Sequence, residues 1–580
     1  MRQKLLALLT ATFFGSASLH TSAAPAPAAI DTAAGIYANQ IGFLPNQYKA
    51  AVVPNTGANE FKLTDKASGK VVYNGVLSSA QAWQEAQETV KTAEFTGFNY
   101  PGEYQLSVDG VKSSFDITIK PGIYREALAG AIKYYYYNRN SAALEQRHAG
   151  EFHRPASHPD TIVYVDASAA TEERPAGAII ESPKGWFDAG DYGKYIVNSN
   201  ITVYTLLRAL ENNPALFASL DLNIPESNNA LPDLLDEILW NLDWMETMQD
   251  TDGGLYHKLT AKNFEALAMP HLEYEPRYVV QKSTAATLGF AATMARASLV
   301  LEQYSKHLPE HAERYKNAAL RAWEWAEDHP ATVFEQPEGF RTGMYASSAD
   351  QLSDEWAWAS AELFALTGKK KYLKEFEVPK SIRSPEWRDV EALAMLSLAN
   401  NPKTPKKLKA EVEAKLVETA DNWVQQMKAS GYGVAMAGGD FRWGSNGVAA
   451  NKAAALFAIN ALAPNAAYLE TAESLLDYLL GRNPNNVSYL TGFGERAIKA
   501  PHHRVSEADD VLAPVPGMLA GGPHTGHQDK DECERLKAPY EANIPAKAYH
   551  DHWCSYATNE VAINWNAGLV YTLAEMNRRN

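Results

Sequence analysis

The sequence predicts a mainly α-helical protein in which a small β-sandwich precedes one large helical domain. Three observations carry this prediction. Short β-branched and aromatic runs, separated by turn residues, fill residues 35–118. Apolar residues then recur with helical spacing from residue 119 to the end of the chain at 580. No alternation of strands and helices appears in that second region, which argues against a parallel α/β fold.

Residues 1–23 are predicted to be a secretory signal peptide. The segment begins with two basic residues, continues with an apolar run over 5–14 and ends in small residues, with cleavage near Ala23. The alternative is a membrane anchor, but the run is too short to span a bilayer. We therefore expect an exported protein, periplasmic or secreted, without a membrane partner. Residues 24–34 are expected to form a flexible tether.

The β-sandwich is predicted over residues 35–118. Its expected strands are the runs "YKAAVVP", "EFKLTD", "KVVYNG", "GEYQLSV" and "SSFDITI". Turn pairs such as Ser68-Gly69 and Pro101-Gly102 separate them. Short strands at this spacing are typical of a small two-sheet domain.

The helical domain is predicted over residues 119–580. Its clearest helix is "ALPDLLDEILWNLDWMETMQD", where Pro232 falls in the first turn, a position at which proline is tolerated. Apolar residues at steps of three and four place one face of this helix in the core: Leu231, Leu234, Leu235, Ile238, Leu242 and Met245. Further helices are expected in segments 201–212, 282–304, 309–328, 354–366, 389–400, 405–428, 448–462, 465–481 and 559–576. Helices paired in two layers around a toroid would suit this number.

Composition narrows the class of protein and of partner. Hydrophobic residues make up 46% of the chain and charged residues 21%, which is typical of a globular protein. The net charge is 53 − 69 = −16, so a nucleic-acid partner is not expected. An acidic surface is compatible with a neutral or cationic substrate.

The chain has two cysteines, Cys533 and Cys554. An oxidising compartment favours a disulfide between them, and closing a loop of this size would stabilise the fold by roughly 3 kcal/mol. The alternative is a pair of free buried thiols.

The stretch "ESPKGWFDAGDYGKY" places Asp188 and Asp191 three residues apart, among glycines and aromatic residues. One aspartate could cap the helix that follows. Capping does not account for both acids, nor for the glycines, which suit close approach of a ligand to the backbone. The stretch therefore indicates a catalytic or binding loop.

Near the other end of the chain, Glu560 precedes an apolar stripe spaced by fours. Asn559 or Thr558 could cap a helix here, which would make Glu560 a first-turn residue with a pKa lowered by the helix dipole. If Glu560 is instead a general acid, burial and neighbouring carboxylates must raise its pKa. Two carboxylates from one loop and a carboxylic acid from another fit the cleavage of a glycosidic bond.

Seven segments resemble glycoside hydrolase family 9, the cellulase family. They are "GWFDAGDYGKY", "NNALPDLLDEILWNLDWMETMQD", "GGLYHKLT", "DEWAWASAELFALTG", "LLGRNPNNVSYLTGFG", "PHHRVS" and "YATNEVAINWNAGLV". The opening "YANQIGFLP" resembles the immunoglobulin-like module that precedes the catalytic domain in one form of this family. The resemblance implies an (α/α)6 barrel that follows an immunoglobulin-like β-sandwich.

The resemblance also implies an activity, which is the inverting hydrolysis of β-1,4-glucosidic bonds in cellulose-type glucans or cello-oligosaccharides. Asp191 matches the general base, Asp188 the partner that helps hold the attacking water, and Glu560 the general acid. His502 and Arg504 of "PHHR" match sugar-binding residues. On its own, that motif could equally be a zinc fragment or a solvated basic turn.

Aromatic side chains are expected to stack on sugar rings. Trp443 in "RWGSNG" and Trp186 are the two candidate platforms, and core packing is the alternative for each, which we favour except at Trp443.

The resemblance implies no organic cofactor, but it does imply a structural calcium site. The matching oxygens are those of Asp350, Asp354, Glu355 and Asp389. Oxygen-rich clusters suit calcium, and the alternative is a solvated acidic helix start.

Relatives with the immunoglobulin-like module often hold zinc through two cysteines and two histidines. The comparable stretch here contains His148, His153 and His158 but no cysteine, so we expect no zinc site of that type.

Other functions remain open at this stage. The same catalytic motifs occur in enzymes that act on glucosamine oligomers from chitosan, and an acidic cleft would favour that amine. A catalytically dead carbohydrate-binding protein is disfavoured because all three carboxylates are present. A polysaccharide lyase would need a cationic site, which this acidic cluster does not offer. The sequence does not distinguish endo from exo action, and we expect a monomer.

Overall fold

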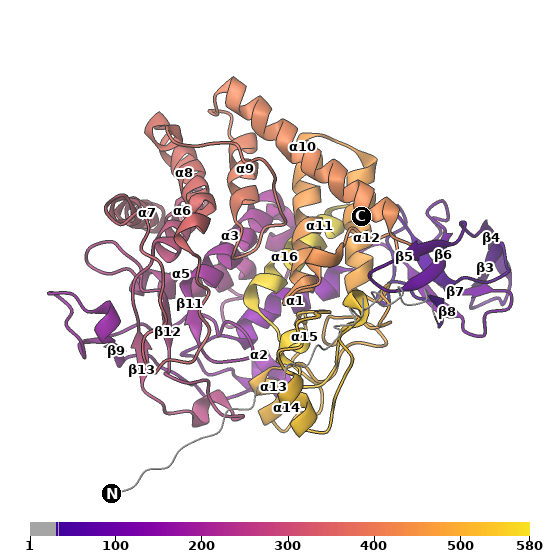
Figure 1. Ribbon diagram of the computed structural model, residues 1–580, viewed down its shortest axis with the longest axis horizontal. Helices are drawn as coiled ribbons and strands as arrows, with labels where there is room; N and C mark the ends of the chain where they lie inside the picture. The colour runs from indigo at the N-terminus through magenta and orange to yellow at the C-terminus, as the bar shows by residue number, and fades with distance from the viewer. Residues whose placement is uncertain (1–30, 33, 580) are drawn as a thin grey trace, which may run out of the picture.

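The computed structural model describes residues 31–579 with the exception of residue 33. The predicted signal peptide and most of the predicted tether lie outside the described residues. Figure 1 shows a large helical body with a small β domain at one side. The β1 strand (Asp31–Thr32) pairs in parallel with a later strand, so the end of the segment expected to be a tether runs along a sheet edge.

The β domain is a sandwich of two sheets. The first has the order β1-β6-β2, with β5 also paired to β6: β2 (Ala50–Pro54), β5 (Gln81–Trp83) and β6 (Glu88–Glu94). The second has the order β4-β3-β7-β8: β3 (Glu60–Asp65), β4 (Val71–Val76), β7 (Gly102–Val108) and β8 (Phe115–Ile119). Val53, Phe61 and Leu106 lie in the core between the sheets. All five predicted strands are present.

The helical body is an (α/α)6 barrel. Six helices form the closed inner ring, each in contact with the next: α3 (Ile196–Asn212), α6 (Thr284–Leu301), α8 (Ser353–Thr367), α9 (Glu391–Asn400), α11 (Ser445–Leu462) and α16 (Ile563–Arg578). The outer layer contains α1 (Arg125–Tyr137), α5 (Asp233–Thr247), α7 (His311–Asp328), α10 (Lys406–Ala429) and α12 (Ala466–Leu479). Inner helices such as α6 and α11 are buried nearly all round, whereas α7 and α10 bury one face only.

Short elements connect these helices. The short α-helices are α2 (Gln146–Ala149), α4 (Pro214–Ala218), α13 (Arg504–Ala508), α14 (Lys530–Arg535) and α15 (Tyr556–Asn559). The 3-10 helices are η1 (Gly150–Phe152), η2 (Ala167–Ala169), η3 (Pro270–Leu272), η4 (Glu302–Tyr304), η5 (Ala349–Gln351), η6 (Lys370–Leu373), η7 (Gly438–Asp440) and η8 (Pro545–Lys547).

A third sheet lies at one end of the barrel (Figure 1). Its order is β10-β9-β13-β12-β11: β9 (Val163–Val165), β10 (Ile179–Ile180), β11 (Lys194–Tyr195), β12 (Lys258–Thr260) and β13 (Arg277–Val279). The β11 strand leads directly from the "DAGD" loop into α3. This sheet therefore fixes the place of the loop that carries the two aspartates.

Among the described helices, only the α6 segment (Thr284–Tyr304) is long and apolar enough to cross a membrane. Its apolar window is 94% buried inside the protein. Its composition is therefore that of an inner barrel helix.

The sandwich is joined to the barrel by buried polar contacts. Asn39 donates to the carboxylate of Asp477 in α12 over 2.9 Å. Glu88 of β6 accepts from the hydroxyl of Tyr432 and pairs with Lys547 at 2.8 Å. The charged residue Glu88 at the start of β6 thus binds the neighbouring domain, and β6 was not recognised as a strand from the sequence.

Candidate active site

A cavity of about 900 Å³ opens at the end of the barrel where the inner helices begin. Its lining comes largely from the loops that precede those helices, which is why residues far apart in the sequence meet there. Asp188, Asp191 and Glu560 all line this cavity. The structure therefore brings together the three carboxylates that the sequence singled out.

Asp188 is buried and held by two hydrogen bonds. Asn198 donates to its Oδ1 over 2.7 Å, and the hydroxyl of Tyr345 donates to its Oδ2 over 2.6 Å. Burial and the neighbouring charge of Asp191 raise the pKa of Asp188 to about 7, against these two hydrogen bonds. Asp188 is thus held in a fixed position, and its raised pKa places the loss of its proton near neutral pH.

Asp191 accepts at its Oδ2 from the backbone N–H of Gly193 and from the hydroxyl of Tyr195, each over 3.2 Å. Neither aspartate caps α3, because the N-cap is Tyr195 and no side-chain cap is present. The capping alternative is excluded, and both acids face the cavity.

Glu560 does not lie in a helix, so the expected first-turn position was wrong. The α15 helix ends at Asn559, Glu560 has an extended backbone, and α16 begins only at Ile563. Isolated β-bridges pair Glu560 with His502 and Val561 with Ala520. These pairings hold the segment extended although its apolar spacing is helical.

The environment of Glu560 favours its protonated form. Burial raises the pKa of Glu560 to about 8, together with the charges of Asp191 and Asp188. Arg504 and a hydrogen bond from the Trp443 side chain act in the opposite direction. A carboxyl group that retains its proton near neutral pH can act as a general acid.

Of the two expected aromatic platforms, only Trp443 lines the cavity, where it is 38% exposed. Trp186 is fully buried, so its expected role in substrate binding was wrong. Its ring packs at a tilt against that of Tyr135, with the ring centres 4.6 Å apart, and its indole nitrogen donates to Glu237 over 3.4 Å. Trp186 supports the loop from behind and does not contact the cavity.

His502 and Arg504 both line the cavity. His502 stacks on Trp553 at 5.3 Å, and its Nδ1 lies 2.6 Å from the Trp553 carbonyl oxygen. Arg504 donates from Nη1 to the carbonyl oxygen of Gly190 over 2.8 Å. Arg504 therefore holds the aspartate loop as well as facing the cavity.

Further residues line the cavity that sequence reasoning missed. Tyr345 reaches Asp188 from a loop, with a left-handed backbone (φ 46°) that is costly for an aromatic residue. Trp387 packs against Tyr345 at 5.0 Å, and the guanidinium of Arg388 lies 4.5 Å from the Trp387 ring. No local pattern marks Tyr345, because its partner is 157 residues away.

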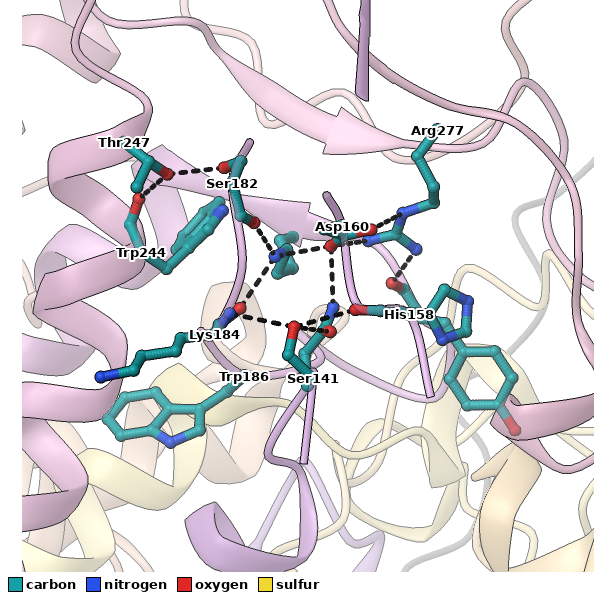
Figure 2. A network of polar contacts seen from close by, with 12 residues as sticks. Ser141, His158, Asp160, Ser182, Lys184, Trp186, Trp244, Thr247 and Arg277 are labelled. Carbon is teal, nitrogen blue, oxygen red and sulfur yellow. Dashed lines mark hydrogen bonds and ion pairs between the residues drawn. The ribbon is translucent and has the colours of Figure 1, made fainter. Parts of the chain in front are cut away.

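Figure 2 shows a network of polar contacts around Asp160, close to Lys184 and Arg277. Lys194 pairs with Asp160 at 2.8 Å and donates to the carbonyl oxygen of Lys184 over 2.8 Å. Arg277 pairs with Asp160 and donates to the carbonyl oxygen of Tyr192 over 2.7 Å. The network ties the segment around Asp160 to both ends of the aspartate loop.

We expected no zinc site in the stretch that contains His148, His153 and His158, and these three histidines have different contacts. His148 contacts Asn223, and His153 contacts a carbonyl oxygen of its own turn. His158 packs between Phe187 and Tyr192 (Figure 2 shows it beside the ion network).

The acidic residues expected to bind calcium separate into two groups. Asp350 is exposed, whereas Asp354 and Glu355 are buried at the start of α8, close to Asp389. Asp354 Oδ1, Glu355 Oε2 and Asp389 Oδ1 are buried oxygens without a hydrogen-bond partner. Glu391, which the sequence analysis did not include, adds a fourth carboxylate, and its pKa is raised to about 7 by burial, Asp389 and Asp354. Unpartnered carboxylate oxygens of this kind suit a hard cation.

Cys533 and Cys554 form a disulfide, with their Cα atoms 5.1 Å apart. The bond connects α14 to the segment that leads to Glu560.

Comparison with known proteins identifies the family. The model of glycosyl hydrolase family 9 matches residues 124–573, and that of the cellulase N-terminal immunoglobulin-like domain matches residues 31–113. The chain belongs to glycosyl hydrolase family 9. It is 38% identical to a xyloglucan-specific endo-β-1,4-glucanase of Bacteroides ovatus over 92% of both chains. It is 33% identical to endoglucanase D of Acetivibrio thermocellus, over 99% of this chain and 86% of that protein.

Solved structures of family 9 have the same fold. A family 9 protein of Bacteroides ovatus superimposes with a TM-score of 0.86 at 36% identity, covering 94% of this chain and 99% of that one. A thermostable endoglucanase of Alicyclobacillus acidocaldarius gives a TM-score of 0.84 at 31% identity, covering 94% and 99%. The protein is therefore a glycoside hydrolase of the endo-β-1,4-glucanase family, with the barrel and the immunoglobulin-like module that the sequence predicted.

Proposed function

We propose that the protein hydrolyses β-1,4-glucosidic bonds within glucan chains, with inversion at the anomeric carbon. Glu560 protonates the leaving oxygen, Asp191 takes a proton from the attacking water, and Asp188 helps to hold that water. The observation that carries the proposal is the meeting of these three carboxylates in one cavity, where the pKa of Glu560 is raised to about 8. Glu560 then keeps its proton near neutral pH and can donate it to the leaving oxygen, as a general acid must.

The test compares Glu560→Gln and Asp191→Ala with the matched variant Glu386→Gln. Glu386 lines the same cavity but pairs with Arg442 at 3.1 Å, outside the proposed machinery. We expect the first two variants to lose about 10²–10⁴-fold in turnover of cellotetraose, as is usual for loss of acid–base catalysis, while their thermal unfolding stays cooperative. Near wild-type turnover in both variants would refute the proposed roles.

The substrate is expected to be a neutral glucan. Arg388, Arg442 and Arg504 line the cavity together with four carboxylates, so charge alone does not select the substrate, and the proposal of a glucan rests on the relatives that are named for glucan cleavage. Rates on cello-oligosaccharides, xyloglucan and chitosan oligomers would order the substrates. A higher rate on chitosan oligomers than on both glucans would favour the glucosaminidase alternative.

We also propose a structural calcium ion between α8 and the start of α9. Asp354, Glu355 and Asp389 would hold it, because each has a buried oxygen without a hydrogen-bond partner; their oxygens do not all lie within 4.8 Å of one another, so binding would draw the three side chains together. The ion would neutralise this acidic cluster and hold the loop before α9, which carries Trp387 and Arg388. It takes no part in the proposed proton transfers.

Export is proposed on the basis of the N-terminal sequence pattern, and the disulfide is compatible with an oxidising compartment. Fractionation of cells that produce the full chain would test it. Retention of the whole product in the cytoplasm would contradict it.

A further inference from the structure

The segment between Asp529 and Tyr556 borders the cavity, and Tyr556 is the residue of it that lines the cavity. It supplies the carbonyl oxygen of Trp553, which lies 2.6 Å from His502 Nδ1, and it places Tyr556 in the cavity lining. The segment is cross-linked internally by the disulfide between Cys533 and Cys554. The cross-link therefore lies within a segment that borders the active site.

Two histidines lie beside this disulfide. Among the residues that the structure describes, His550, His552 and Cys554 are the only three His, Cys, Asp or Glu residues whose ligand atoms all lie within 4.8 Å of one another. The two imidazole rings stack in parallel, 5.4 Å apart with planes inclined by 6°. The Nε2 atom of His550 is buried and has no hydrogen-bond partner. A buried, unpartnered ring nitrogen beside a sulfur is an available metal ligand.

Reduction of the disulfide would complete a set of four donors. The Sγ atom of Cys533 is bonded to that of Cys554 but does not belong to the group within 4.8 Å, so after reduction the Cys533 side chain would turn toward the two imidazoles. Two sulfurs and two imidazole nitrogens are a set that binds Zn²⁺ tetrahedrally in structural sites. Both cysteine side chains are fully buried and both histidines are partly exposed, so a cation can approach from the imidazole side.

We propose that Cys533, His550, His552 and Cys554 form an alternative zinc cross-link that replaces the disulfide under reducing conditions. A dithiol reductant passes two electrons and two protons to the disulfide, becomes a disulfide itself and leaves two cysteine thiols. Zn²⁺ then binds both sulfurs and one nitrogen of each imidazole, and the two thiol protons pass to solvent. Either the disulfide or the zinc ion would cross-link the segment that carries Trp553 and Tyr556.

The binding test uses the full mature chain and Zn²⁺ alone, with no glucan present. The protein is reduced, the reductant is removed without oxygen, and zinc affinity is measured by competition with a chromophoric chelator. We expect one tightly bound Zn²⁺ per reduced chain beyond any bound by the oxidised chain. Equal zinc binding by the oxidised and reduced chains would overturn the proposal.

The double variant His550→Ala, His552→Ala is the matched control, because it retains both cysteines and lies outside the proposed catalytic residues. Loss of an outer-shell partner alone weakens metal binding by about 10–100-fold, so loss of two ligands should weaken it by at least about 100-fold. Co²⁺ in the reduced wild type should give the absorption of a tetrahedral site with a thiolate charge-transfer band. Wild-type affinity or an unchanged cobalt spectrum in the double variant would refute the assigned ligands.

Thermal unfolding separates a metal site from simple loss of the cross-link. If the reduced chain without metal no longer unfolds cooperatively, Zn²⁺ must restore the transition in the wild type and fail to do so in the double variant. Failure of Zn²⁺ to raise the melting temperature of the reduced wild type would also overturn the proposal. Neither measurement depends on the proposed hydrolysis.

Discussion

The hydrogen bond from Tyr345 to Asp188 gives a quantitative prediction. The variant Tyr345→Phe removes a donor 2.6 Å from Asp188 Oδ2 and leaves Asn198 as the remaining partner. A hydrogen bond to a charged group contributes about 1.5–3 kcal/mol, which corresponds to a pKa change of about 1–2 units. The pKa of Asp188, already raised to about 7, should therefore rise further in the variant.

The assay is the pH dependence of kcat/KM on cellotetraose. If ionised Asp188 holds the water, a rise of its pKa by about 1–2 units from about 7 brings it to or above the pKa of about 8 of Glu560, so the acid limb moves up to the alkaline limb and the maximal kcat/KM falls. Tyr192→Phe is the matched control, because that hydroxyl donates to the carbonyl oxygen of Ala268 and to neither aspartate. An acid limb that is unchanged in Tyr345→Phe, or moves equally in Tyr192→Phe, would refute the reasoning.

Four further predictions concern stability and binding. Because the pKa of Glu560 is raised to about 8 in the folded protein, its contribution to stability is full below pH 4.5 and is lost as pH rises through about 8. Glu560→Gln should therefore raise the melting temperature relative to wild type more above pH 8 than below pH 4.5. Asp160→Ala removes the carboxylate that pairs with the buried cations Lys194 and Arg277, and should lower the free energy of unfolding by about 3–5 kcal/mol in urea denaturation. Chelation of calcium should lower the melting temperature of the wild type but not that of Asp354→Asn, since a bound ion stabilises the folded state. Trp443→Ala should raise KM a few-fold with a smaller change in kcat, because aromatic stacking contributes about 0.5–1.5 kcal/mol.

Each of these predictions has a result that would contradict it. A Glu560→Gln stability difference independent of pH would show that the raised pKa is wrong. A loss below 1 kcal/mol in Asp160→Ala would mean that the ion network is solvated. An equal fall in the melting temperature of wild type and Asp354→Asn on addition of the chelator would show that any bound calcium lies at another site. A fall in kcat at constant KM for Trp443→Ala would argue against a stacking platform.

Local sequence patterns were sufficient for most of the architecture. The long barrel helices could be predicted because the residues on a buried helix face are apolar and recur at steps of three and four. The strands with alternating apolar residues were located for the same kind of reason. The β6 strand was missed because charged residues such as Glu88 serve the contact with the barrel.

Tertiary contacts decided the places where the sequence was misleading. Glu560 sits in a helical pattern but is extended, since it pairs with the backbone of His502, which is 58 residues earlier in the chain. Trp186 lies in the aspartate loop, and a sequence does not state whether such a ring points to the cavity or to the core. Tyr345 could not be found at all, because its role depends on a contact across 157 residues.

The most direct test of the mechanism is time-resolved proton NMR of the mature protein with cellotetraose. The account predicts that the α-anomer of the product appears first, because water held by Asp188 and Asp191 attacks the face opposite the bond that Glu560 protonates. Early appearance of the β-anomer would show retention of configuration, make one aspartate a nucleophile and contradict the proposed mechanism.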